Sequence, residues 1–279
     1  MLERTLPIVE CMEYDEFTDR VELLRELETW LKNIRYKRSG STSIISPRRM
    51  GKTVLLERLV NTVFFKPEYH VAPIYFSMGT EKMTLRAFIM QYSETFFRQY
   101  IAYCLQDPEL YNDKSISPKI LVEIETNNED VKNAQKHFQN FLTFFETHHY
   151  DSNIIHWANV ICLPELVASS SNTYAAIIID EFQEMKFMAY DMPLTLFNEF
   201  KAKRQLIDEG AADLTNSYRR QSQSRVAPML VSGSAVTMIF KTVMGALWVV
   251  DLVSHMSNPF PFLMVSHYCF ISFVSIVRI

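Results

Sequence analysis

The hydrophobic positions of this chain follow two patterns, helical spacing and short continuous apolar runs. Between residues 16 and 34 apolar side chains recur every three or four positions, which predicts an amphipathic helix capped by Thr18 or Asp19. The apolar run at 43–45 predicts a buried parallel strand. Helical spacing returns directly afterwards, over 55–63, so the chain is expected to pass from this strand through a tight loop into a helix.

Three later apolar runs, at 71–77, 175–179 and 228–231, predict further strands. Pro73 lies inside the first run, and proline cannot donate a ladder hydrogen bond, so that strand is expected at a sheet edge or a bulge. The run at 175–179 is the clearest, because five apolar residues are followed directly by two acids.

Helical patterns separate these strands. An aromatic-rich helix of about 25 residues is expected after Gly79, with its aromatic stripe in the core, and another over 131–147. Residues 107–118 have the composition of a loop. One weaker helical pattern lies within 151–173, before a Ser-rich loop. Another lies over 191–208. Alternation of strands and helices predicts an α/β fold with a mainly parallel sheet.

Composition adds few constraints to this picture. The 279 residues suit one large domain or one domain with a small appendage, and a formal net charge of -4 gives no clear nucleic-acid signal. The four cysteines are far apart and form no CxxC pair, so neither a zinc site nor a disulfide framework is predicted. No signal-peptide pattern opens the chain, and a cytoplasmic location is expected.

The C-terminal tail has a different composition. Residues 252–277 contain no Asp, Glu, Lys or Arg. The most apolar part, 261–277, is at the short limit for a transmembrane helix, and Ser266 and His267 count against one. Membrane contact, a sheet segment and an unpaired apolar segment therefore remain alternatives for 261–277.

The loop between the first strand and its helix carries a phosphate-binding pattern. Its expected nucleotide contacts are Ser46, Pro47, Arg48, Arg49, Met50, Gly51, Lys52 and Thr53. Backbone amides and the helix dipole would hold the β-phosphate, Lys52 would reach the β- and γ-phosphates, and the Thr53 hydroxyl would bind Mg²⁺. Gly51 lets the backbone approach the phosphates. Ser46 replaces the first glycine of the pattern, which is compatible with the turn if its φ angle is negative.

Acidic and polar residues follow two later strands. Asp180 ends the clearest strand, where its carboxylate is expected to hold Mg²⁺, and Glu181 is expected to orient and deprotonate the attacking water. Parallel strands present their carboxyl ends at one sheet edge, so both acids should lie near the loop. Ser232 and Ser234 follow the last strand, either as sensors of the γ-phosphate or as an ordinary turn.

Four segments together resemble the archaeal-type ATPases of the STAND branch, relatives of the AAA+ ATPases. They are the lead-in at 17–24, the SPRRMGKTVLL loop at 46–56, IIDEFQ at 178–183 and LVSGS at 230–234. The resemblance implies a P-loop NTPase fold with a three-layer α/β/α core, bound ATP and Mg²⁺, and a following helical lid and winged helix. It also implies that Arg20 lies near the nucleotide, and that Arg48 and Arg49 contact a partner or the γ-phosphate side.

The chain departs from this family after residue 245. The family's Gly-Arg pair is replaced by a glycine without the arginine, and the lid and winged helix do not fit the remaining residues. The expected organisation is a lead-in helix at 1–38, an ATPase core at 39–245 with a helical insertion at about 80–172, and an atypical hydrophobic tail at 246–279. A truncated or frame-shifted end and a native lineage-specific tail are both consistent with this composition.

The sequence thus predicts an ATP-binding protein that acts as a Mg-dependent ATPase and molecular switch. The alternatives are a non-hydrolysing nucleotide-binding interaction module, a truncated ATPase fragment, and a protein associated with membranes through its tail. A protein partner or self-association is expected. Arg219, Arg220 and Arg225 are candidates for an arginine finger, with a solvated helix face as the other interpretation.

Overall fold

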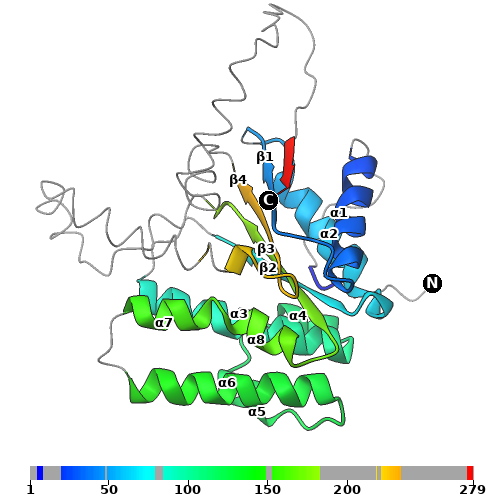
Figure 1. The fold of residues 1–279 in the computed structure, drawn as a ribbon. Helices are drawn as coiled ribbons and strands as arrows, with labels where there is room; N and C mark the ends of the chain where they lie inside the picture. Colours follow the sequence, from blue (N-terminus) through cyan, green and yellow to red (C-terminus); the bar gives the residue numbers. More distant parts are fainter. Residues whose placement is uncertain are drawn as a thin grey trace, which may run out of the picture.

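A computed structural model describes residues 5–8, 20–47, 49–78, 84–148, 153–182, 218, 221–233 and the backbone of 275–278. These residues form an α/β fold around a five-stranded sheet with the order β2-β3-β4-β1-β5 (Figure 1). The first four strands of that order are parallel, and β5 pairs antiparallel with β1. The strands are β1 (Thr42–Ile45), β2 (Val71–Ser77), β3 (Tyr174–Asp180), β4 (Met229–Gly233) and β5 (Ser275–Arg278). The predicted α/β class and mainly parallel sheet are confirmed.

Helices lie on both sides of this sheet. In Figure 1, α1 (Val21–Ile34) and α2 (Lys52–Phe64) lie on one side, and α3 (Leu85–Leu105) and α8 (Leu163–Ser169) on the other. The helix α6 (Glu129–Thr147) packs against α3 on the side away from the sheet. All described elements between β2 and β3 are helical. The remaining ones are α4 (Pro108–Asn112), α5 (Pro118–Glu123) and α7 (Asn153–Val160).

The strand β2 lies at the sheet edge, as Pro73 predicted. Its outer side is covered by helix α3, whose Gln99 side chain takes the place of a neighbouring strand. The Tyr75 amide donates to Oε1 of Gln99 at 2.7 Å, and Nε2 of Gln99 donates to the Tyr75 carbonyl at 3.2 Å. The Tyr111 hydroxyl donates to the Pro73 carbonyl at 2.7 Å. Side chains thus satisfy backbone groups that an open edge would expose.

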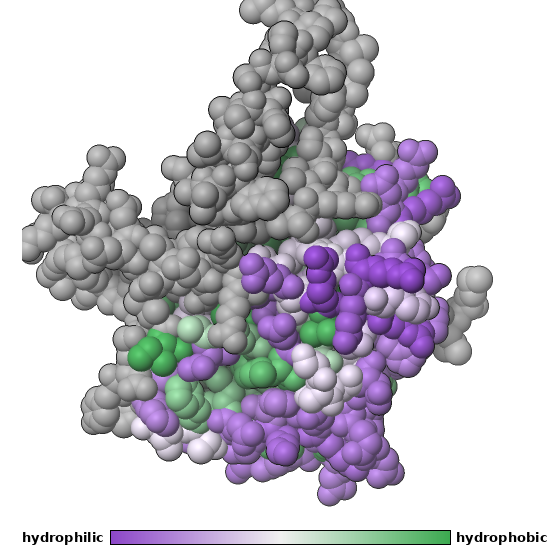
Figure 2. Space-filling model, in the orientation of Figure 1, coloured by the Kyte–Doolittle hydropathy of each residue, from purple (hydrophilic) through white to green (hydrophobic). Residues whose placement is uncertain are grey.

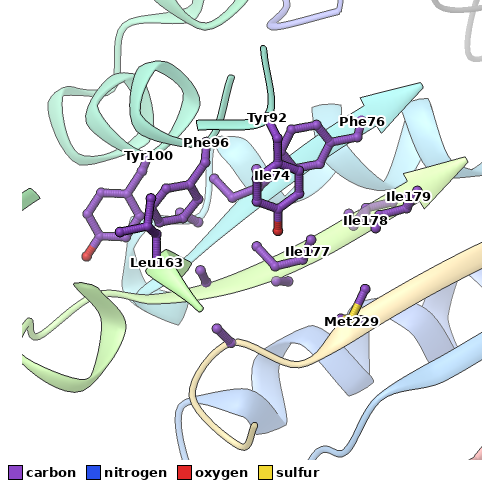
Figure 3. Close-up of a cluster of buried hydrophobic side chains, with 14 of the residues drawn as sticks. Ile74, Phe76, Tyr92, Phe96, Tyr100, Leu163, Ile177, Ile178, Ile179 and Met229 are labelled. Atoms are coloured by element: carbon purple, nitrogen blue, oxygen red, sulfur yellow. The ribbon is translucent and has the colours of Figure 1, made fainter. Parts of the chain in front are cut away.

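The aromatic stripe of α3 is a core stripe, which confirms the prediction. Its aromatic residues Phe88, Tyr92, Phe96, Phe97 and Tyr100 are all buried. Figure 3 shows Tyr92, Phe96 and Tyr100 facing the apolar residues of β2 and β3. The Tyr92 ring stacks on Phe76 with 4.4 Å between centroids, and the Tyr100 hydroxyl donates to the Thr173 carbonyl. On the face that Figure 2 shows, apolar surface lies over the helical layer that contains α3, amid hydrophilic side chains.

Two expectations about local structure are wrong. Residues 107–118 include the helix α4, because the Asp107 carboxylate caps it by accepting from the amides of Glu109 and Leu110, and Pro108 follows at the first helical position. Residues 151–173 hold two helices, α7 and α8, where one was expected. A helix of five residues carries too few apolar positions for its period to be recognised.

Other expectations are only partly covered by the described residues. The helix α1 begins after Arg20, which makes no side-chain cap, and Thr18 and Asp19 lie outside the described residues. The helix expected over 191–208 and most of the tail also lie outside them. Among the helices that the structure describes, none is both long and apolar enough to span a membrane.

Replacing Gln99 by leucine should lower the free energy of unfolding by about 2 kcal/mol, because the amide and carbonyl of Tyr75 both lose their partner. The matched control is Gln91→Leu, an exposed position on the same helix, which should change it by less than about 0.5 kcal/mol. Urea denaturation measures both. Equal losses in the two variants would show that Gln99 does not protect the edge.

Candidate functional site

Parallel pairing brings the carboxyl ends of three strands to one edge of the sheet. In the register, Ile45 of β1 pairs with Gly233 of β4, and Ile179 of β3 pairs with Val231. Since β4 lies between β1 and β3, Ser232 is placed between the loop that follows β1 and the carboxylate that ends β3. Ligands of open α/β sheets bind at this kind of edge.

The Asp180 carboxylate is the centre of this site. The residue is only 1% exposed, so its charge needs hydrogen-bond donors. Its Oδ2 accepts from the Thr53 hydroxyl at 2.5 Å, although the two residues are 127 positions apart. Its Oδ1 accepts from the Ser232 hydroxyl and from the Glu181 amide, the latter at 3.0 Å. One buried carboxylate therefore joins α2, β3 and β4.

The Thr53 and Asp180 oxygens fit a small hard cation. Neighbouring ligand oxygens around octahedral Mg²⁺ lie about 3 Å apart, so the 2.5 Å pair needs only slight widening to act as two ligands of one ion. No group of three or more His, Cys, Asp or Glu side chains gathers in the described part of the chain. A cation here would take its other ligands from water or a phosphorylated molecule, as Mg²⁺ commonly does.

The N-terminus of α2 has the features of an anion-binding helix end. Gly51, its N-cap, has a φ of 69°, a left-handed conformation that glycine adopts without a Cβ penalty. No side chain caps the helix and its first turn contains no acid. The amides of that turn and the positive end of the helix dipole are thus left to a ligand.

Two basic side chains lie at this helix end. Lys52 is 4% exposed, and its Nζ donates to the carbonyls of Ser46 at 3.0 Å and Pro47 at 2.9 Å. Nη1 of Arg20 is buried with no hydrogen-bond partner among the described residues, and a Cβ built on Gly51 would lie 3.8 Å from it. Oγ of Ser46 is also buried without a partner there. Buried polar atoms without partners are uncommon and fit a phosphate group near Gly51.

The loop backbone shows whether Ser46, which replaces the first glycine of the pattern, has a strained φ angle. Among the described loop residues only Arg49, at 63°, and Gly51 have positive φ angles, so Ser46 avoids the left-handed strain. Arg49 instead carries that strain, which costs on the order of 1 kcal/mol. Glu181 has a φ of 54° directly after Asp180, a backbone conformation that proteins often retain at functional sites.

Most of the predicted site residues meet at this edge. Lys52 bonds the carbonyl of Ser46, and Thr53 and Ser232 both bond Asp180. Arg20, Gly51 and Glu181 adjoin them, and Pro47, Arg49 and Met50 complete the loop. The structure gives Ser232 a bond to Asp180, which its sequence position did not predict.

The remaining predicted residues are not in this cluster. Arg48, Ser234, Arg219 and Arg220 lie outside the described residues. Arg225 precedes β4 and lines a hollow with Arg25 and Arg38, at the opposite end of that strand from Ser232. The fold therefore does not bring Arg225 to the site of its own chain.

Comparison with protein-family models, with curated proteins and with solved structures finds no match for this chain. The interpretation of the site therefore depends on the geometry just described. The resemblance to STAND ATPases stays a proposal.

Replacing Ser232 by alanine should lower the free energy of unfolding by about 2 kcal/mol, because the buried Asp180 carboxylate loses one of its donors. The control is Ser43→Ala, a buried serine on the neighbouring strand β1 for which no bond to Asp180 is found; it should cost less than about 1 kcal/mol. Chemical denaturation of both variants checks this. A larger loss at Ser43 would contradict the role given to Ser232.

Proposed function

We propose that this chain binds ATP with Mg²⁺ at the loop between β1 and α2 and acts as an ATPase molecular switch. In this proposal it is a P-loop NTPase of the STAND and AAA+-related group, with a three-layer α/β/α core. The observation that carries the proposal is the hydrogen bond between Thr53 and Asp180. It joins the hydroxyl that follows the phosphate-loop lysine to the acid that ends an apolar parallel strand, the two protein groups that hold Mg²⁺ in P-loop NTPases.

The phosphates would lie against the N-terminus of α2. The Lys52 ammonium would exchange the carbonyls of Ser46 and Pro47 for phosphate oxygens, a short movement because it already lies inside the loop. The orphaned Nη1 of Arg20 would gain a partner on the same side of Gly51. These two cations offset the charge that ATP brings into a partly buried site.

Magnesium, when bound, would screen the phosphate charge at the β- and γ-oxygens. Thr53 and Asp180 are its proposed protein ligands. Ser232 and the Glu181 amide both bond Oδ1 of Asp180, which leaves Oδ2 directed at Thr53. Ser232 is therefore proposed as the residue that orients the carboxylate, in place of a direct sensor of the γ-phosphate.

Hydrolysis is assigned to Glu181. This carboxylate is half-buried next to Asp180, where it would accept a proton from a water aligned with the γ-phosphate. Held by the bond from its amide to Asp180, the Glu181 backbone moves with the metal ligand. If the Asp180 carboxylate moves when nucleotide binds or leaves, Glu181 would move with it, as a molecular switch requires.

Replacing Lys52 by alanine should weaken Mg-ATP binding at least tenfold, because the loop loses its phosphate-binding ammonium. Isothermal titration calorimetry of the full chain measures it, with Lys132→Ala on the exposed face of α6 as the control that keeps full affinity. Chelation of Mg²⁺ with EDTA should weaken ATP binding to the unsubstituted chain as well. Equal affinities of the Lys52 and Lys132 variants would refute this site.

Replacing Glu181 by glutamine should retain ATP affinity within about threefold and reduce phosphate release at least 100-fold, the scale of lost general-base catalysis. A coupled phosphate-release assay and calorimetry on the same preparations give both numbers. Unchanged phosphate release in the variant would exclude Glu181 as the base. Tight ATP binding without phosphate release from the unsubstituted chain would identify a non-hydrolysing nucleotide-binding module.

A further inference from the structure

A second cavity lies beside the outer edge of the sheet, apart from the phosphate loop. Its volume is about 760 Å³, within the range of small-molecule pockets. Residues 75–78 at the end of β2 form one wall, and α3 forms another. Residues of α4, the segment after it, Leu121 of α5, Glu57 of α2 and Ile8 also line the cavity. None of the described residues predicted for the nucleotide site lines this cavity.

Arg98 is the notable side chain of the lining. It is 6% exposed, and its Nη1 has no hydrogen-bond partner among the described residues. No ion pair of Arg98 is found in that part of the chain either. Arg98 is therefore a buried cation that lines a cavity and whose Nη1 has no partner among the residues that the structure describes.

The nearest acids do not neutralise Arg98. Glu94 lies one helical turn earlier and lines the same cavity, but no ion pair joins the two side chains. Burial raises the pKa of the Glu94 carboxyl and lowers the pKa of the Arg98 guanidinium, and the attraction between these two charges offsets only part of each shift. Asp113 is exposed and its Oδ1 accepts from the amide and the hydroxyl of Ser115.

An unpaired buried guanidinium is costly. Removing an ion from water costs several kcal/mol even after relaxation, and arginine cannot escape this cost by losing its proton. A carboxylate or phosphate in the cavity would recover much of the cost through a two-pronged charged hydrogen bond. The aromatic lining residues Phe76 and Phe88 would contact an apolar body attached to that group.

We propose that this cavity binds a small organic anion, with its carboxylate or phosphate paired to Arg98 and its apolar body against Phe76 and Phe88. The cavity differs from the proposed nucleotide site, because Arg98 belongs to α3, whereas Lys52 belongs to α2 and does not line the cavity. The two places adjoin at Ser77 in the cavity wall, which pairs with Asp180 in the sheet. Exposed Lys114 at the cavity supplies a second positive charge for the same group.

The test is calorimetric titration of the full chain with benzoate, phenyl phosphate and inorganic phosphate, and with neutral benzamide. Benzoate or phenyl phosphate should bind with a dissociation constant below about 1 mM, and the tighter of the two identifies the preferred head group. Benzamide and inorganic phosphate, which lack the charge and the apolar body respectively, should each bind at least tenfold more weakly. Binding of benzamide as tight as that of benzoate would overturn the assignment to an anion.

Substitutions in the cavity and in the phosphate loop show where the anion binds. Arg98→Gln should weaken the better anion at least tenfold, whereas Lys52→Ala should leave it unchanged. Thr95→Trp, at a half-buried position of the cavity wall, should block binding by filling the space while the Arg98 charge stays, and it keeps the test valid if Arg98→Gln does not fold. Circular dichroism checks the fold of each. The proposal fails if both cavity variants keep full affinity, if Lys52→Ala abolishes binding of the better anion, or if the unsubstituted chain binds neither anion.

Discussion

The described structure depends on the burial of one charge, the carboxylate of Asp180. A carboxylate that is 1% exposed is tolerated only if donors surround it, and the donors come from α2, from β4 and from Glu181, the residue after its own strand. This requirement accounts for the hydroxyl of Thr53 in the first turn of α2 and for that of Ser232, the next-to-last residue of β4. The same convergence produces the candidate site, because the elements that satisfy Asp180 also carry the phosphate-loop residues. Stability of the sheet edge and the proposed metal chemistry thus share one set of hydrogen bonds.

Two aspartates and two arginines of the described structure differ in their hydrogen-bond partners. Asp180 has several internal donors, and Asp107 is used as a helix cap. By contrast, Nη1 of Arg20 and Nη1 of Arg98 are buried without partners among the described residues. One lies at the N-terminus of α2 and the other opens onto the cavity beside β2. Since guanidinium groups remain charged, an anion from outside the chain is proposed at each position, a phosphate at the first and an organic anion at the second.

Local sequence was sufficient for the larger elements. The apolar runs at 43–45, 71–77 and 175–179 correspond to strands, because a buried parallel strand must be apolar on both faces. The position of Pro73 was enough to place β2 at an edge, since the missing amide cannot serve an inner ladder. Short helices such as α4 escaped detection, because their stability comes from a cap and from packing on α3, and neither leaves a periodic pattern.

For the candidate site, the sequence by itself determined the residue types and their order: a glycine and lysine before a helix, a threonine next, and two acids after an apolar strand. It also required that the strand ends share an edge. Only the tertiary structure decided that Thr53 and Ser232 both donate to Asp180, and that Arg98 lines a cavity with its Nη1 unpartnered by the described residues. The physical reason is that hydrogen bonds and unpaired charges depend on distances between residues far apart in the chain. The order of residues along the chain does not give these distances, because they depend on how the strands pair and in which register.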